Sequence, residues 1–242
     1  MGRVFEKRKH KMFKRYATMA KQFTKVGKEI AIAVKAGGPD PNTNARLRMV
    51  IQNSKAVNMP KERVDAAIQK AAGKADATNF EEITYEGKGP GGVTIVVETA
   101  TDNPTRTIAD LRVIYDRAGG AVGKTGSSDY LFDHKGVFRI NTKGVNLEDL
   151  ELEGIDAGLE SLDPNDEGDA LVYCDFPDFG TLQKFLEGKK IEVIEAKLTR
   201  LPKSFVSLTA EQLVDFNKML EKLEENEDVQ EVYHNLQEQE EE

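Results

Sequence analysis

The sequence of 242 residues has no tryptophan, one cysteine and three histidines. The single cysteine, Cys174, excludes an intrachain disulfide and is typical of a reducing compartment. No apolar run approaches the roughly 20 residues that a bilayer-spanning helix needs. The N-terminus also lacks the apolar segment of a secretory signal. We therefore expect a cytoplasmic protein that does not cross or bind a membrane.

Residue types that commonly carry catalysis or bind metals are few and scattered. His10, His134 and His234 lie in unrelated segments without metal-ligand spacing. Cys174 falls in an apolar stretch and is expected to be a buried strand residue. The glycine-rich stretch 87–92 lacks the Gly-Lys-Ser/Thr ending of a phosphate loop and precedes a strand pattern. The sequence therefore predicts a protein that is not an enzyme and that uses no metal or cofactor.

Positive charge is concentrated at the start of the chain. Residues 1–75 carry 18 Lys and Arg against 5 Asp and Glu, a balance of +13. The whole chain holds 34 basic and 42 acidic residues, so the remainder holds 16 against 37, a balance of −21. Such asymmetry is informative about partners rather than about fold. It predicts a polyanion as the partner of the basic head and leaves a basic protein as a candidate partner of the acidic body.

The basic residues are placed periodically. Cations from residue 7 to residue 15 recur at i, i+1, i+4, i+7 and i+8, and therefore form one stripe if the segment is helical. A stripe of this kind can neutralise successive phosphates and release counterions. A solvated helix face, an anionic membrane surface or a calmodulin-like groove are the alternatives. The expected nucleic-acid contacts are Arg3, Lys7, Arg8, Lys11, Lys14, Arg15, Lys21, Lys25, Lys28, Arg46, Arg48 and Lys61.

Helical periodicity dominates the first 75 residues, which we interpret as about four helices forming a domain over 1–76. Breaks are expected at residues 37–41, where Asp40 would be an N-cap and Pro41 would lie in the first turn of the next helix. Further breaks are expected at residues 58–60 and at Gly73. Little strand pattern is present in this part of the chain.

From Phe80 onward the apolar period becomes that of alternating strands and helices. One β-α-β-β-α-β pattern is expected from a strand at 137–140, a helix at 147–155, strands at 159–162 and 170–174, a helix at 179–186 and a strand at 191–198. A second is expected from strands at 93–98, 130–132, 204–208 and 229–233 and helices at 105–118 and 210–223. The predicted fold class is α+β, with a helical N-terminal domain and two ferredoxin-like domains. One domain, 77–134 with 201–242, would be interrupted by the other, 135–200, and an acidic tail would follow at 238–242.

Several short strings resemble the YebC/PmpR family, and the resemblance covers nearly the whole chain. The strings are Gln22-Phe23-Thr24-Lys25, Asp40-Pro41 with Asn44 and Arg46-Leu47-Arg48, Asn58-Met59-Pro60-Lys61, Tyr85-Glu86-Gly87 with Gly89-Pro90-Gly91-Gly92-Val93, Thr101-Asp102-Asn103 with Arg106-Thr107, Gly119-Gly120, Gly126-Ser127, and Asp228-Val229-Gln230 with Val232-Tyr233. Family members usually begin with a tryptophan-containing segment, and this chain differs there. The resemblance implies three domains and a DNA-binding transcriptional regulator, although mitochondrial relatives are described as translational activators and some bacterial members as helpers of stalled ribosomes.

Two functions therefore remain open at the level of sequence. A DNA-binding regulator would grip phosphates with the basic helices, and Lys55 and Arg63 could extend that face. Only Gln52 and Asn53 are base-reading residue types in the second helical hairpin, so the pattern favours phosphate contact over base reading. A factor that binds structured RNA or the ribosome would use the same face, because structured RNA is recognised by shape and phosphate.

Overall fold

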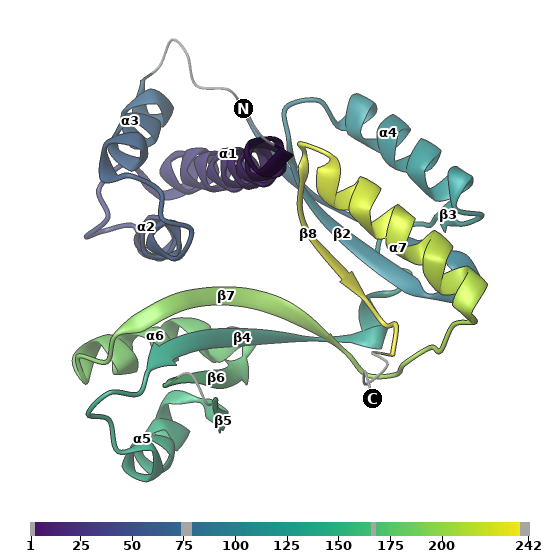
Figure 1. The fold of residues 1–242 in the computed structure, drawn as a ribbon. Coiled ribbons are helices and arrows are strands. Elements are labelled where there is room, and N and C mark those ends of the chain that lie inside the picture. Colours follow the sequence, from purple (N-terminus) through teal and green to yellow (C-terminus); the bar gives the residue numbers. More distant parts are fainter. Residues whose placement is uncertain (1–2, 74–78, 166–167, 238–242) are drawn as a thin grey trace. The chain divides into compact units, whose positions relative to one another are not determined.

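A computed structural model describes residues 3–73, 79–165 and 168–237, with side chains described from Thr18 onward. The chain forms two compact units, Met1–Glu82 with Ala100–Asp102, and Ile83–Thr99 with Asn103–Glu242. The described fold is α+β, with a helical N-terminal part followed by two four-stranded sheets, which confirms the predicted fold class (Figure 1). The expected acidic tail at 238–242 lies outside the described residues.

The helical part of the first unit contains α1 (Arg3–Gly37), α2 (Ala45–Ala56) and α3 (Lys61–Ala72). The prediction of about four helices was wrong, because α1 is one continuous helix of 35 residues. Between Arg3 and Ala36 the sequence has no proline and only one glycine, Gly27, and a single glycine does not end a helix. A small core of α1, α2 and α3 side chains is centred on Ile30, Leu47 and Val64.

The turn between α1 and α2 differs from the predicted one. The predicted N-cap Asp40 instead accepts the backbone N–H of Asn42 at 2.9 Å. Asn44 caps α2, because its side-chain oxygen accepts the Leu47 N–H at 3.0 Å. Its amide nitrogen donates to the carbonyl oxygens of Ala33 and Gly38 at 2.7 and 2.8 Å. One buried asparagine therefore closes the end of α1 and opens α2.

The first sheet of the second unit has the order β3-β1-β2-β8. Its strands are β1 (Glu81–Lys88), β2 (Thr94–Thr101), β3 (Ala121–Val122) and β8 (Val229–His234). Two helices, α4 (Pro104–Arg117) and α7 (Ala210–Glu225), lie side by side over one face of this sheet (Figure 1). Apolar residues of β2, α4 and α7 form the core between them, including Ile95, Leu111 and Phe216.

Two strands predicted for this sheet are absent from the described structure. The segment expected at 130–132 is a 3-10 turn, Asp129–Leu131, that leads directly into β4. The segment expected at 204–208 makes only an isolated bridge between Val206 and Leu236. The strand beside β2 is instead β1, which precedes β2 in the chain and is joined to it by the short 3-10 turn Pro90–Gly92. Residues 130–132 and 204–208 have local strand propensity, but propensity alone does not show whether a segment pairs into a sheet.

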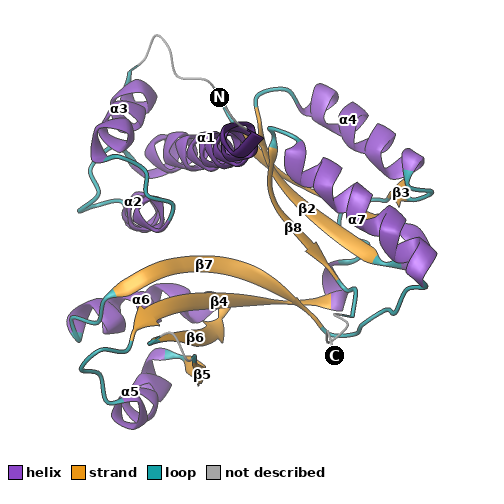
Figure 2. Cartoon of the chain, in the orientation of Figure 1, coloured by secondary structure: helices purple, strands orange, loops and turns teal. Residues whose placement is uncertain are grey.

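The second sheet has the order β5-β6-β4-β7, which is the arrangement of the predicted β-α-β-β-α-β unit. Its strands are β4 (Phe132–Asn141), β5 (Leu159–Pro164), β6 (Asp169–Asp175) and β7 (Val193–Pro202). Helices α5 (Leu147–Gly154) and α6 (Phe179–Gly188) cover one face, where Phe138 and Phe179 stack at 4.6 Å between ring centroids (Figure 2). The division into domains at 1–76, 77–134 with 201–242, and 135–200 stays a prediction.

Gly87 of β1 permits close packing between the first sheet and α4. A Cβ atom at this position would lie 2.4 Å from Tyr115 Cε1 and 2.6 Å from the Ala121 carbonyl oxygen. We therefore expect Gly87→Ala to lower the free energy of unfolding by about 1–3 kcal/mol, measured as a shift of the urea transition followed by circular dichroism. Gly180→Ala in α6 is the control, because nothing lies within 4 Å of its added Cβ. Equal midpoints for the two variants would contradict this account of Gly87.

Candidate nucleic-acid interface

The basic stripe predicted at the start of the chain lies on α1. The residues concerned are Arg3, Lys7, Arg8, Lys11, Lys14 and Arg15, and all belong to the helix Arg3–Gly37. Their side chains lie outside the described part of the structure. The helical backbone gives these positions the spacing on which the predicted stripe depends, while the phosphate-contacting role stays a prediction.

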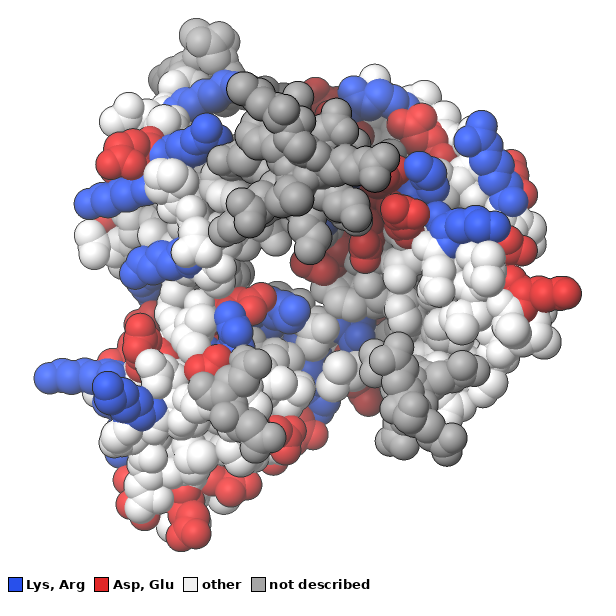
Figure 3. Space-filling view, in the orientation of Figure 1, with Lys and Arg blue, Asp and Glu red and all other residues white. Residues whose placement is uncertain are grey.

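Exposed cations are present on each of the three helices. Lys21 is exposed on α1, and Lys25, one turn later, is half-buried. Lys55 ends α2 in an exposed position, and Lys61 is exposed at the start of α3. In the space-filling view several Lys and Arg side chains project from the surface of α2 and α3 (Figure 3). The described part of the helical unit therefore carries exposed positive charge on all three helices.

Lys28 does not lie on the exposed face that its spacing predicts. The residue is buried, and its ammonium group donates to the Ala100 carbonyl oxygen at 3.0 Å. The same ammonium lies 5.3 Å from the centroid of the Phe80 ring. The expectation of an exposed Lys28 was wrong, because helical spacing identifies a face without revealing what packs against it. Lys28 is better explained as a structural contact within the first unit, between α1 and Ala100.

The two predicted arginine contacts of α2 make bonds within their own unit. Arg46 forms two hydrogen bonds with the Glu82 carboxylate, of which the Nη1–Oε2 bond measures 2.9 Å. Arg48 donates to the Pro41 carbonyl oxygen at 2.9 Å and so holds the turn before α2. Both side chains are partly exposed. Their first role in this structure is to stabilise the unit, and any contact with phosphate would share or replace these bonds.

The base-reading candidates of α2 are partly covered. Gln52 and Asn53 are each half-buried, while the buried side of this helix carries Leu47, Val50 and Ser54. Sequence-specific reading requires amide or guanidinium groups that reach the edges of bases. The described part of α2 is therefore better suited to contact with a phosphate backbone than to insertion as a recognition helix.

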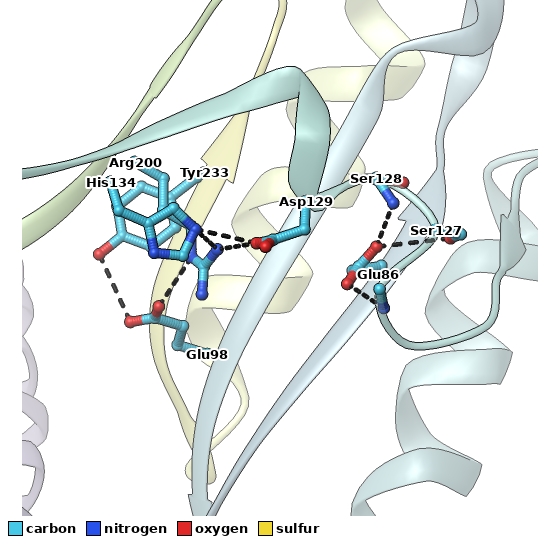
Figure 4. Close-up of polar contacts among 9 residues, drawn as sticks. Glu86, Glu98, Ser127, Ser128, Asp129, His134, Arg200 and Tyr233 are labelled. Carbon is cyan, nitrogen blue, oxygen red and sulfur yellow. Dashed lines mark hydrogen bonds and ion pairs between the residues drawn. The ribbon is translucent and has the colours of Figure 1, made fainter.

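An ion network that sequence reasoning missed lies in the second unit. The Arg200 guanidinium of β7 donates to Glu98 Oε1 at 3.0 Å and to Asp129 Oδ1 at 2.7 Å (Figure 4). His134 Nε2 lies 2.9 Å from Asp129 Oδ1 and 2.5 Å from Arg200 Nη1. The hydrogen bond with His134, followed by that with Arg200, holds the pKa of the Asp129 carboxyl below its usual range. No local pattern could reveal a network whose members are up to 102 positions apart.

Two further contacts extend this network to β8. The Tyr233 hydroxyl lies 3.5 Å from Glu98 Oε2 and 3.4 Å from the Leu198 carbonyl oxygen. Burial, followed by the nearby Glu98 charge, raises the pKa of this phenol. Residues of β2, β7 and β8 therefore share one set of polar contacts, and the two sheets of this unit are joined by them.

Glu86, in one of the strings that resemble the family, organises an exposed loop. Its carboxylate is buried and accepts the backbone N–H groups of Gly126 at 2.6 Å and Ser128 at 2.5 Å (Figure 4). The Ser127 hydroxyl lies 3.4 Å from the same carboxylate. Two strings 40 positions apart in sequence, one around Glu86 and one around Gly126, therefore meet in a structural contact.

The Asp228 carboxylate likewise joins two strings that resemble the family, one around Asn103 and one around Asp228 itself. This buried carboxylate accepts from the Thr107 hydroxyl at 2.9 Å and from Arg106 Nη2 at 2.8 Å. Asn103 caps α4 by accepting the Arg106 N–H at 3.1 Å. The string Asp102-Asn103 with Arg106-Thr107 is thus tied to the turn before β8. These contacts give Asn103, Arg106, Thr107 and Asp228 a structural role in this unit.

The residues considered as catalytic or metal-binding candidates are dispersed in the structure. Cys174 is fully buried in β6, and burial raises the pKa of its thiol to about 11. His134 belongs to the Arg200 network, and His234 packs edge-on against Phe216 at 5.1 Å. Within the described residues no group of three or more His, Cys, Asp or Glu side chains is arranged to hold a metal ion. No described helix has the length and apolarity that a bilayer crossing requires.

Comparison with known proteins identifies the family. Residues 3–74 match the TACO1/YebC protein N-terminal domain, and residues 80–236 match the TACO1/YebC second and third domain. The chain therefore belongs to the TACO1/YebC family.

Similar proteins from several bacteria support this assignment over the full length. A probable transcriptional regulatory protein of Flavobacterium psychrophilum is 49% identical over 238 residues, which cover 98% of this chain and 100% of that protein. One of Cytophaga hutchinsonii is 50% identical over 236 residues and 98% of both chains. The crystal structure of a conserved hypothetical protein from Aquifex aeolicus matches with a TM-score of 0.78 at 36% identity, covering 92% of this chain and 91% of that one. The family thus supports a regulatory role for the chain.

The Glu86 contact leads to a test of the 123–128 loop. In Glu86→Gln one acceptor oxygen is replaced by an amide NH₂ that faces a backbone N–H, so a buried donor loses its partner. We expect a loss of about 1–3 kcal/mol in the free energy of opening this loop. Faster hydrogen exchange of the Gly126 and Ser128 amides, measured by NMR, would show it. Glu81→Gln, an exposed change in the same strand, should leave that exchange unaltered, and unaltered exchange in both variants would contradict the proposed anchor.

The burial of Cys174 leads to a second test. At pH 8 the native protein should react with an aromatic disulfide reagent far more slowly than the protein in denaturant, because the thiol is buried and its pKa is raised to about 11. The release of the coloured thiolate measures the reaction. Rapid stoichiometric reaction of the native protein would show that Cys174 is accessible and ionised.

Proposed function

We propose that this protein is a non-enzymatic nucleic-acid-binding regulator of the cytoplasm, in the first place a DNA-binding transcriptional regulator. Its basic N-terminal helices would contact phosphates. The observation that carries the proposal is the balance of +13 over residues 1–75, against −21 over the rest. The printed names of its relatives, probable transcriptional regulatory proteins, agree with it.

The contact surface proposed from the structure is narrower than the one proposed from sequence. Lys28 leaves it because its ammonium is buried on the Ala100 carbonyl oxygen. Lys21, Lys25 and Lys61 remain, and so do Arg46 and Arg48, whose contact with phosphate would share or replace their bonds to Glu82 and Pro41. The cations of the first helical turns of α1 complete the surface. Each ammonium group that neutralises a phosphate releases condensed counterions, so affinity should fall steeply as salt rises.

Structured RNA, including ribosomal RNA, is the second candidate ligand. The half-buried positions of Gln52 and Asn53 agree with it, because structured RNA is recognised mainly through phosphate and shape. An RNA duplex presents both, with a spacing of phosphates that differs from that of DNA. The two candidates share one protein surface and differ in the geometry of the ligand.

Charge reversal tests the proposed surface. We expect Lys21→Glu, Lys25→Glu and Lys61→Glu together to weaken binding to a labelled DNA duplex at least tenfold in 0.1 M salt. The slope of log affinity against log salt should become shallower by up to about 0.9 for each lost phosphate contact. Fluorescence anisotropy, repeated with an RNA hairpin of equal length, measures both quantities and shows which ligand is preferred.

The matched control reverses the same number of exposed lysines in the acidic unit, at Lys143, Lys184 and Lys197. It changes the net charge equally and should leave affinity within about twofold. Equal losses in both triple variants would mean that net charge alone governs binding. Unchanged affinity of the head variant for DNA and RNA would refute the proposed surface.

A further inference from the structure

The three most exposed aromatic rings among the described side chains gather in one region of the second unit. Tyr130 is 70% exposed, Phe205 61% and Phe176 52%. The region is where the chain enters β4 and leaves β7. Large apolar side chains are usually covered in a folded unit, and aromatic rings left in water are enriched at sites of protein interaction.

Described contacts place these rings near one another. The Phe176 ring packs edge-on against His134 at 6.3 Å between centroids, and His134 bonds to Asp129, the chain neighbour of Tyr130. The Lys203 N–H donates to the Leu131 carbonyl oxygen at 2.9 Å. Tyr130 is therefore one residue, and Phe205 two residues, from this bond between the entering and leaving strands. We call Tyr130, Phe176 and Phe205 the connector rings.

Acidic groups accompany the connector rings. Asp129 is 55% exposed although it accepts from Arg200, and Asp133 is 52% exposed although it pairs with Lys203 at 3.0 Å. Residues 76–242 as a whole carry a balance of −21.

We propose that the connector rings form a docking surface for an arginine-bearing segment of a basic partner protein. A guanidinium group stacks on an aromatic face and pairs with a carboxylate at the same time, and a lysine ammonium does this less well. Exposed rings beside half-exposed carboxylates suit that combination. The net negative charge of this unit would repel a nucleic acid, so a polycation is the occupant that the charge favours. The inference does not depend on the ligand of the N-terminal helices.

Helix α5 provides a comparison surface that is acidic but has no aromatic ring. Residues 147–156 contain five acidic and no basic residues, and Leu152 and Ile155 are 71% and 60% exposed. Acidic side chains cover this helix in the space-filling view (Figure 3). The surface is acidic and apolar but has no aromatic ring. It therefore serves as a matched control for a mechanism that requires stacking.

The experiment measures the anisotropy of a labelled twelve-residue peptide of alternating Arg and Gly, titrated with the full chain in 0.15 M salt. A peptide with Lys in place of Arg and a twelve-nucleotide oligouridine are titrated in parallel. We expect the Arg peptide to bind more tightly than the Lys peptide. Tyr130→Ala with Phe205→Ala should weaken Arg-peptide binding about 5- to 30-fold, which corresponds to two exposed cation–π contacts. Tyr130→Phe should retain binding, because it keeps the ring.

The control variant Leu152→Ala with Ile155→Ala should bind the Arg peptide as the parent does. Unaltered circular dichroism would show that all variants are folded, as expected for changes at exposed positions. Equal weakening in the control, or no effect of the ring variant, would overturn the proposal. Loss of oligouridine binding in the ring variant would assign the surface to nucleic acid instead. Self-association of the parent that the ring variant abolishes would assign it to a second copy of the chain.

Discussion

The pairing of β8 with β2 is the constraint on which the second unit depends. The two strands run antiparallel from Ile95 opposite His234 to Thr99 opposite Val229, although more than 100 residues separate them. Asn235 adds a side-chain acceptor for the Thr94 N–H at 2.7 Å, and Asp228 holds the turn before β8 against α4. This pairing places β8 at the edge of the first sheet. The chain between β2 and β8 must therefore leave this sheet and come back to the strand next to β2. The second sheet is built within that excursion.

The return of the chain brings the connecting segments into contact. Phe132 at the start of β4 lies opposite Pro202 at the end of β7, so the entering and leaving strands are partners in one ladder. Arg200 on the leaving strand then reaches Asp129 before the entering strand and Glu98 on β2. An ion pair with exposed carboxylates contributes little net stability, but it specifies which groups must meet. The Arg200 network therefore specifies the join between the two sheets more than it stabilises it.

Much of this architecture could be predicted from sequence, because most elements carry their own signals. The break at Asn103-Pro104, the β-branched run of β2 and the alternation in β4 to β7 are local, and the corresponding helices and strands are present. The failure of residues 130–132 and 204–208 to join the first sheet could not be predicted, because strand propensity does not show whether a segment finds a pairing partner. The prediction of about four helices was one too many, and residues 3–37 form one helix with no proline in it.

The location of the positive charge in the candidate interface could be predicted from sequence, but the contacts of the individual side chains could not. Counting located the basic head, but helical spacing could not show that Lys28 reaches the Ala100 carbonyl oxygen or that Arg46 binds Glu82. Those outcomes depend on Ala100 and Glu82, which belong to later parts of the sequence. The exposed connector rings were missed for a similar reason. A strand prediction at 130–132 and another at 204–208 implied burial for residues that the structure leaves in turns and extended segments.

The opposite charges of the two parts have a consequence for how the proposed partners would be arranged. An acidic surface held within the Debye length of a phosphate backbone, about 8 Å at physiological salt, raises the free energy of binding by like-charge repulsion. The balance of −21 over residues 76–242 therefore opposes close approach of the second unit to any polyanion that the helices bind. The connector rings belong to this acidic part, so the proposed nucleic acid and the proposed basic protein would bind surfaces of opposite charge.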